Sequence, residues 1–301
     1  MPRLLRRLFS KDFFARVWVR ANEDNIFDRC AQLSYYFLLS LFPLLFFLTT
    51  LFGYFAGAGS QLQRKLITYL GSVVPSSALR LVTATIDEVI AARGGGKLSL
   101  GLLAALWAAS SGINALGQAL NEAYDVAETR PWWKVRLISV AMTVALAVLI
   151  VSALLIVLYG GRLGNFLFSS IHEGDPFSIA WKILQWPIAL TFVFLAFGLI
   201  YQFAPNLPAR RRGRRLPKSD LRRRWLSPGV LVAVLLWMLV SLGFRLYLHF
   251  FNSYSATYGS LGAVIILMLW FYLTGAAILF GAEVNCELEG NNSSSKRRGS
   301  S

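Results

Sequence analysis

Five polar residues lie in the second half of a stretch of the chain, residues 98–121, that contains no charged side chain. They are Ser110, Ser111, Asn114, Gln118 and Asn121. At 100° per residue all except Ser111 fall on one helical face, which we call the polar stripe. A polar stripe is unfavourable against lipid, so it should face other helices or a water-filled cavity. The sequence leaves these two interpretations, interhelical hydrogen bonding and a hydrated cavity, open.

A second candidate site surrounds Arg245, in the outer half of an apolar stretch at residues 228–251. An arginine at a helix centre in a membrane costs on the order of 2.5–3.5 kcal/mol, so it should be paired or hydrated. His249 shares its helical face, and Tyr258 begins the next apolar stretch. The group would suit a carboxylate or a lipid phosphate. In the alternative interpretation Arg245 binds no ligand. It lies close enough to the end of its apolar stretch for its side chain to extend to the membrane surface.

Charged residues border the apolar stretches at one end. Arg29 precedes the first stretch, Glu122 and Asp125 close the second, and Glu283 closes the last. They predict either an ion-pair network that locks the helices together or an inner gate. In the second case Glu283 is the best candidate for a carboxylate that couples to protons.

Residues suited to hydrolysis are sparse. Phosphodiester cleavage needs a histidine pair, a nucleophile with a base, or carboxylates that gather metal ions. The chain has two histidines, His172 and His249, and HEGD at 172–175 lacks the second histidine of a zinc-protease motif. No phosphate-binding Walker A sequence is present. We therefore predict no enzymatic activity, no metal site and no cofactor.

The elements that must position these residues are membrane helices. Hydrophobic residues make up 56% of the chain, and the mean hydropathy is +0.54. The sequence predicts an all-α integral membrane protein whose membrane domain covers residues 30–286. Six stretches are long enough to span a bilayer, at about 31–55, 98–121, 137–159, 179–203, 228–251 and 258–282. The loop at 57–97 has the periodicity of two short amphipathic helices.

Basic residues set the expected orientation. The formal net charge is +15, and most lysines and arginines fall on the side that would hold both termini. The positive-inside rule then predicts cytoplasmic N- and C-termini in a bacterial inner membrane. Residues 1–29 would form a basic interfacial segment, and residues 287–301 a disordered cytoplasmic tail. An arginine-rich segment should contact anionic lipid head groups rather than nucleic acid: Arg210, Arg211, Arg212, Arg214 and Arg215.

Several motifs together cover nearly the whole chain. They are AQLSYYFLLSLFPLL at 31–45, ALWAASSGINALGQALNEAYD at 105–125, RPWW at 130–133, YQFAPN at 201–206, SPG at 227–229 and YSATYGSLGAVIILMLWFYLTGAAILFGAEVN at 254–285. In order and spacing the chain resembles the YihY/virulence factor BrkB family of bacterial inner-membrane proteins. The resemblance implies six membrane helices and no agreed biochemical activity. The family's old label, ribonuclease BN, is generally regarded as a misassignment, and its association with envelope integrity suggests lipid or glycolipid export.

The functional expectation combines these observations. We expect a passive or ion-coupled transporter of a lipid, glycolipid or other amphipathic anion, with the second and fifth helices lining a polar cavity. The alternative is an envelope scaffold that transports nothing, and an intramembrane enzyme is a more remote third reading. The expected partners are membrane lipids with anionic head groups at the cytoplasmic face, and nucleic acid is not among them. The oligomeric state stays open.

Overall fold

The computed structural model describes residues 11–56, 68, 97–167, 175–207, 227–250 and 254–298. All regular structure within these ranges is helical. The helices are α2 (Lys11–Glu23), α3 (Ile26–Ala56), α6 (Lys97–Ala123), α7 (Trp132–Leu167), α8 (Asp175–Phe203), α10 (Pro228–Phe250) and α11 (Tyr254–Arg298). The amphipathic helices expected in the loop at 57–97 and the arginine-rich segment with Arg210–Arg215 lie outside the described residues.

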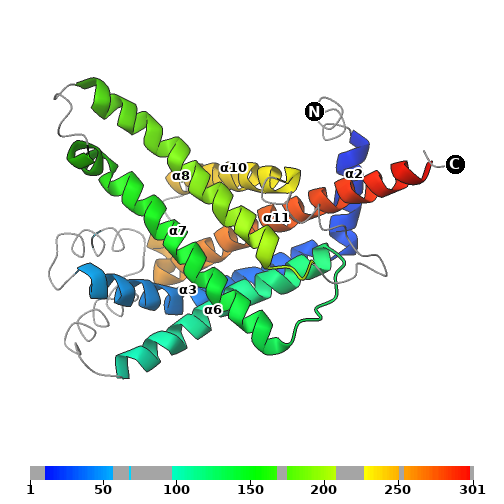
Figure 1. Ribbon diagram of the computed structural model, residues 1–301, viewed down its shortest axis with the longest axis horizontal. Coiled ribbons are helices and arrows are strands. Elements are labelled where there is room, and N and C mark those ends of the chain that lie inside the picture. The colour runs from blue at the N-terminus through cyan, green and yellow to red at the C-terminus, as the bar shows by residue number, and fades with distance from the viewer. Residues whose placement is uncertain are drawn as a thin grey trace.

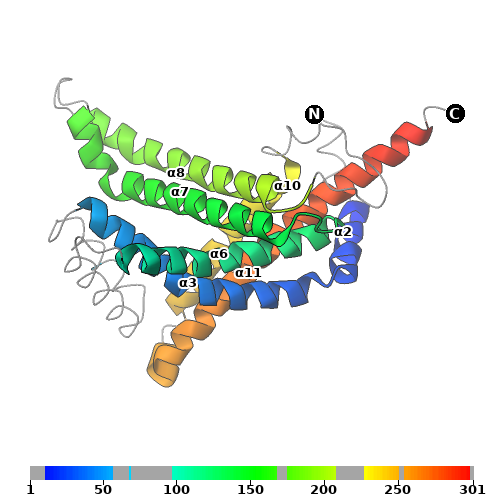
Figure 2. The same cartoon turned by 60° about the horizontal axis from the view of Figure 1, so that its bottom comes forward.

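The six helices after α2 run back and forth along one another. Figures 1 and 2 place α2 beside the C-terminal part of α11, at the end of the bundle where α3 and α10 begin and α6 and α8 stop. We call this the α2 end. α6 packs between α3 and α7, and α10 packs lengthwise on α11. The polar stripe is therefore carried by a helix with neighbours on two sides.

Five of the helices contain a stretch long and apolar enough to cross a membrane: Ile26–Leu48, Trp132–Ala153, Ile183–Phe203, Pro228–Leu248 and Val264–Leu288. These confirm an all-helical membrane fold. α6 is not among them, since its described residues include the polar stripe, which lowers their hydropathy. Its 27 residues would still extend about 40 Å. The count of six spans and the orientation of the termini stay predictions.

The tightest packing is where α10 crosses α11. A Cβ atom placed on Gly281 would lie 2.5 Å from the Gly229 carbonyl oxygen and 2.7 Å from the Ala233 Cβ. The Tyr201 hydroxyl of α8 donates a hydrogen bond to the Ile278 carbonyl next to this crossing. Small residues let membrane helices approach to backbone contact. The crossing fixes three helices at the α2 end.

The largest buried cluster also lies toward this end. Its fully buried side chains come from α3, α6, α8, α10 and α11 and include Leu33, Leu120, Tyr201, Val234 and Leu279. α2 adds a smaller cluster, because Phe13 and Val17 pack against Val284 of α11. Many leucines elsewhere on the helices remain exposed. An outer surface of this kind suits contact with lipid.

The C-terminal segment differs from the expectation. Residues 287–301 were predicted to be a disordered tail, whereas α11 continues through Arg298. Extending a helix costs little once its earlier turns have formed, so a polar sequence can follow a packed one. The composition of the tail alone does not reveal this, because the preceding turns supply the nucleus.

Candidate functional site

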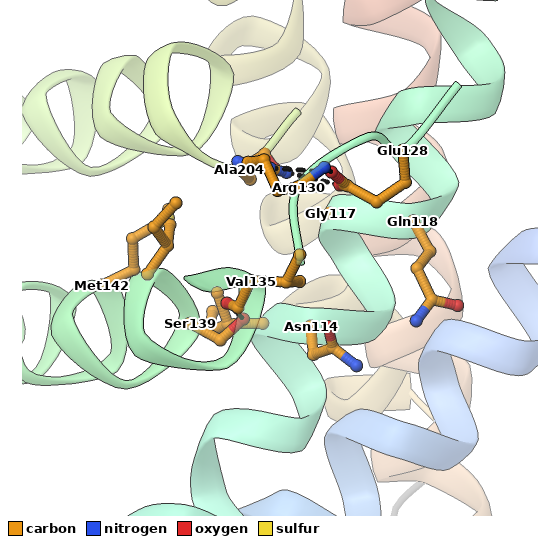
Figure 3. A pocket seen from close by; sticks show the side chains of 11 residues that line it. Asn114, Gly117, Gln118, Glu128, Arg130, Val135, Ser139, Met142 and Ala204 are labelled. Atoms are coloured by element: carbon orange, nitrogen blue, oxygen red, sulfur yellow. Dashed lines mark hydrogen bonds and ion pairs between the residues drawn. The ribbon is translucent and has the colours of Figure 1, made fainter. Parts of the chain in front are cut away.

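A small cavity lies between α6, α7, the loop after α6 and the end of α8. Its volume is about 50 Å³. The polar side chains around it are Asn114, Gln118, Glu128, Arg130 and Ser139. Figure 3 shows Glu128 and Arg130 paired on one side of the cavity, with Asn114 and Ser139 on the other. A cavity of this size has room for a few water molecules, although most of its accessible lining is apolar.

The middle of the polar stripe faces this cavity. Asn114 is half-buried and Gln118 is exposed. Within the described part of the chain, neither amide side chain takes part in a hydrogen bond. A residue that only holds helices together would have its amide paired across the interface. Asn114 and Gln118 therefore carry free donors and acceptors at the edge of the cavity, and the Gln118 amide is directed away from Arg130 and Ser139 (Figure 3).

The floor of the cavity is a closed hydrogen-bond network. Asn121 Nδ2 donates to Glu128 Oε2 at 2.9 Å, and the backbone N–H of Asn206 donates to Asn121 Oδ1 at 2.6 Å. Arg130 pairs with Glu128 at 2.6 Å and also donates to the Ala204 carbonyl at 3.0 Å. That carbonyl is one of the groups that α8 leaves unpaired at its C-terminus. One arginine thus ties the loop after α6 to the end of α8.

The network also sets the charge state of Glu128. Burial opposes ionisation of this carboxyl, but hydrogen bonds from the Arg130 side chain and backbone and from Asn121 outweigh it. The pKa of Glu128 therefore lies below its ordinary value. Glu128 is an anion at neutral pH, and Arg130 balances its charge.

Local backbone geometry brings these residues together. α6 stops at Ala123, and Asp125 has a φ of 50°, a left-handed conformation that turns the chain out of the helix. Beyond α8, Asn206 Nδ2 donates to the Ala127 carbonyl at 3.2 Å and to Thr129 Oγ1 at 2.9 Å. The loop after α6 and the segment after α8, which both contribute residues to the cavity lining, are therefore bonded to each other.

A second polar network joins α10, α11 and the end of α6. Asn285 Oδ1 accepts a hydrogen bond from the Gly229 backbone N–H at 2.8 Å. Its Nδ2 donates to the Tyr124 hydroxyl and to Ser227 Oγ, both at 3.0 Å. These groups are buried, so each bond replaces one that water would have made. The network belongs to the α2 end and not to the cavity.

The charged residues predicted to form one network occur in separate pairs. Arg29 of α3 pairs with Glu122 of α6. Glu283, whose side chain is 0% exposed, pairs with Arg20 of α2 at 3.1 Å. Asp125 is exposed in the turn after α6. The geometry links α2 to α11 and α3 to α6, and whether any of these residues gates a path stays a prediction.

The remaining candidate residues are spread over the molecule. Ser110 is buried and its hydroxyl donates to the Trp107 carbonyl of its own helix, whereas Ser111 accepts from Arg136 of α7. Arg245 is exposed on α10 and meets no carboxylate within the described residues. The side chains of His249 and Tyr258 lie outside the description, as do Arg210–Arg215. No three His, Cys, Asp or Glu side chains in the described ranges are close enough to share a metal ion.

Three residues with central roles were not identified from the sequence: Glu128, Arg130 and Arg136. Trp132 and Trp133, which follow Arg130, are exposed, as is typical of aromatic side chains at a membrane interface. A signal was nevertheless present. Glu128 and Arg130 are opposite charges two residues apart in a short loop, directly after a polar stripe.

Comparison with known proteins places the chain in a family. The profile of the family described as "Virulence factor BrkB" matches residues 17–301. A Bacillus subtilis protein named "Putative ribonuclease-like protein YfkH" is 36% identical over 280 residues, which cover 93% of this chain and 94% of that protein. A "UPF0761 membrane protein" of Alteromonas mediterranea is 28% identical over 291 residues, covering 92% of this chain and 88% of the relative.

A further "UPF0761 membrane protein", from Cronobacter sakazakii, is 27% identical over 281 residues, covering 90% of this chain and 86% of the relative. No solved structure matches the chain. The family profile, the near full-length relatives and the apolar helices all agree with the resemblance drawn from the sequence motifs. The chain belongs to the BrkB family of membrane proteins.

Proposed function

We propose that the protein moves a lipid, glycolipid or other amphipathic anion across a bacterial inner membrane. The observation that carries this proposal is the pair of unbonded amides, Asn114 and Gln118, at a cavity beside Arg130. Unpaired polar groups within a membrane helix are costly unless water or a ligand meets them. Two unpaired amides beside a fully hydrogen-bonded network are what a site that binds a polar ligand transiently would have.

The surrounding charges favour an anionic or dipolar cargo. Arg130 donates to Glu128 and to the end of α8, so its charge is largely balanced where it stands. A phosphate or carboxylate entering the cavity could accept hydrogen bonds from Asn114, Gln118 and the edge of Arg130. The cavity of about 50 Å³ would hold only part of a head group. The apolar remainder of the cargo would stay in the lipid.

No group for ATP hydrolysis was found in the sequence, so movement would be passive or coupled to an ion gradient. In this proposal α6 is a sixth span, both termini are cytoplasmic, and the α2 end faces the cytoplasm. The networks of Asn121 and Asn285 would then close the cavity on that side. Membrane lipids would be the partners of the protein.

Purified protein in liposomes tests the proposal. A fluorescent phospholipid in both leaflets and an impermeant quencher outside report transbilayer exchange. The wild-type protein should accelerate exchange, and the double variant Asn114→Leu/Gln118→Leu should return it to the protein-free rate. Thr191→Val is the matched control, since Thr191 is exposed on α8 and bonds only the Pro187 carbonyl of its own helix.

Two results would contradict the proposal. The first is exchange no faster than in empty liposomes for several head groups, with and without a proton gradient, which would favour the scaffold. The second is a double variant that folds and moves lipid as fast as wild type, which would remove the cavity from the mechanism.

A further inference from the structure

Arg136 lies one turn inside the apolar stretch of α7. Its guanidinium carbon is 4.2 Å from the centre of the Trp107 ring on α6. Nη2 donates to the Trp107 carbonyl, and both Nη1 and Nη2 lie 3.4 Å from Ser111 Oγ. Stacking and hydrogen bonding together hold the guanidinium in a fixed plane against α6.

The charge of Arg136 is not balanced by any carboxylate of the described residues. Within the described residues no carboxylate lies within ion-pair distance of it. The described arginines that have an acidic partner are Arg16, Arg20, Arg29 and Arg130, and of these Arg29 lies inside a long apolar stretch, about one turn from its start as Arg136 is. A cation inside a membrane helix normally pairs or reaches water. Arg136 therefore lacks an anion that its position calls for.

The outer face beside Arg136 is apolar and open. Trp107 is 52% exposed, and Leu103 and Leu137 are also exposed on α6 and α7. Trp132, Trp133 and Lys134 precede Arg136 by less than one and a half turns, and such residues mark the head-group level of a bilayer. An anion that reaches Arg136 here would have acyl chains beside these leucines.

We infer that Arg136, Trp107 and Ser111 form a binding site for the phosphate of an anionic lipid head group. Nη1 makes one hydrogen bond and has a second N–H to donate, while the Trp107 ring fixes the direction of that donor. Ser111 is one turn from Asn114, so a bound head group would lie next to the cavity. The site rests on the proposed function in its choice of ligand, and its binding is measurable without transport.

Lipid binding to the purified protein tests the site. In detergent micelles, phosphatidylglycerol is titrated and bound lipid is counted by native mass spectrometry, with phosphatidylcholine and glycerol phosphate as separate arms. Arg136→Gln should weaken phosphatidylglycerol binding about tenfold, because a charge-assisted hydrogen bond and the net charge are both lost. Glycerol phosphate should bind far more weakly, since it lacks the acyl chains.

Arg16→Gln is the matched control. Arg16 also carries one positive charge on a partly exposed side chain, but it pairs with Glu287 and lies outside the long apolar stretches. This variant should bind phosphatidylglycerol as wild type does. Trp107→Leu should weaken binding severalfold while Arg136 keeps its charge.

Equal affinity in Arg136→Gln and wild type would overturn the site, as would an equal loss in Arg16→Gln. If Arg136→Gln does not fold, phosphatidylglycerol binding is measured with Arg136→Lys and Trp107→Leu instead. Unchanged binding in both variants would overturn the site. Glycerol phosphate binding as tightly as the lipid would replace the lipid site by one for a free phosphate. Intact Arg136-dependent binding without lipid movement would contradict the proposed transport and leave the site standing.

Discussion

The middle of the polar stripe and its end at Asn121 differ in how their amides are used. Asn121 is buried, and both its oxygen and its nitrogen bond to groups from two loops. Asn114, two turns away on the same face, has no hydrogen bond to the described chain and lines a cavity. The same residue type thus serves to close the α2 end and to leave the middle of α6 open. The two asparagines lie on the same helical face, so their position in the sequence pattern does not distinguish them. They differ in the residues of other segments that pack against them.

The close crossing of α10 and α11 should give the largest effect at the α2 end. Gly281→Ala places a Cβ within 2.7 Å of Ala233 and closer still to the Gly229 carbonyl, so helices must separate. We expect a loss of about 3 kcal/mol or more, at the upper end for overpacking. Thermal unfolding in detergent measures it.

Gly243→Ala on α10 is the control for that substitution. No atom lies within 4 Å of the position of its Cβ. Alanine should there raise stability by up to about 1 kcal/mol, because glycine is the poorer helix former. If both alanines are tolerated equally, the close crossing is not what holds the α2 end.

The Arg20–Glu283 pair should give the next largest effect. Arg20→Gln leaves the fully buried Glu283 carboxylate without its cation. Removing one partner of a buried pair costs about 3–5 kcal/mol, and the 29% exposure of Arg20 reduces this to about 2 kcal/mol. Arg16→Gln, which breaks the more exposed pair with Glu287, should cost about 1 kcal/mol or less. Equal losses would show that the burial of Glu283 does not matter.

The stripe itself offers the sharpest pair of substitutions. Asn121→Leu leaves the Asn206 N–H without its acceptor and removes one of the two hydrogen bonds to Glu128 Oε2, which keeps Arg130, so it should lower stability by about 1–3 kcal/mol. Asn114→Leu removes no described hydrogen bond and should change stability by less than about 0.5 kcal/mol. Denaturant titrations followed by tryptophan fluorescence compare them. A larger loss for Asn114→Leu would make the middle of the stripe structural.

The smallest effect should be a pH dependence from Glu128. Its pKa is lowered on folding, so the carboxylate contributes stability above the ordinary value and loses it as pH falls through the folded value. Wild type should therefore lose more stability than Glu128→Gln between about pH 7 and about pH 3.5. Identical pH profiles in thermal unfolding would show that Glu128 is not held ionised by Arg130 and Asn121.

The membrane class, the helices and the stripe could be predicted from the sequence, because hydropathy and a 3.6-residue period are local properties. The ends of the helices were harder: α11 runs to Arg298 since a packed segment nucleates a polar one. Which amide is bonded could not be predicted at all. Asn121 owes its partners to loops 7 and 85 residues away in sequence.

The contact around Arg136 shows the same limit, while the prediction of an anion site at Arg245 stays a prediction. Arg245 stood out because it interrupts a charge-free run, whereas Arg136 lies beside a cluster of tryptophans and lysine that suggests only an interface. The structure shows Trp107 and Ser111 of α6 against Arg136, a contact set by the packing of α6 on α7. This contact cannot be predicted from the spacing of residues within α6 or within α7.

The most direct test of the central contrast is the reactivity of single introduced cysteines in intact membranes. Asn114→Cys and Asn121→Cys are treated with a small charged thiol reagent after each is shown to fold, and the wild-type chain gives the background, since Cys30 and Cys286 are buried. An open cavity above a closed α2 end predicts rapid labelling at position 114 and protection at position 121. Protection at both positions, or equal labelling at both, would contradict it.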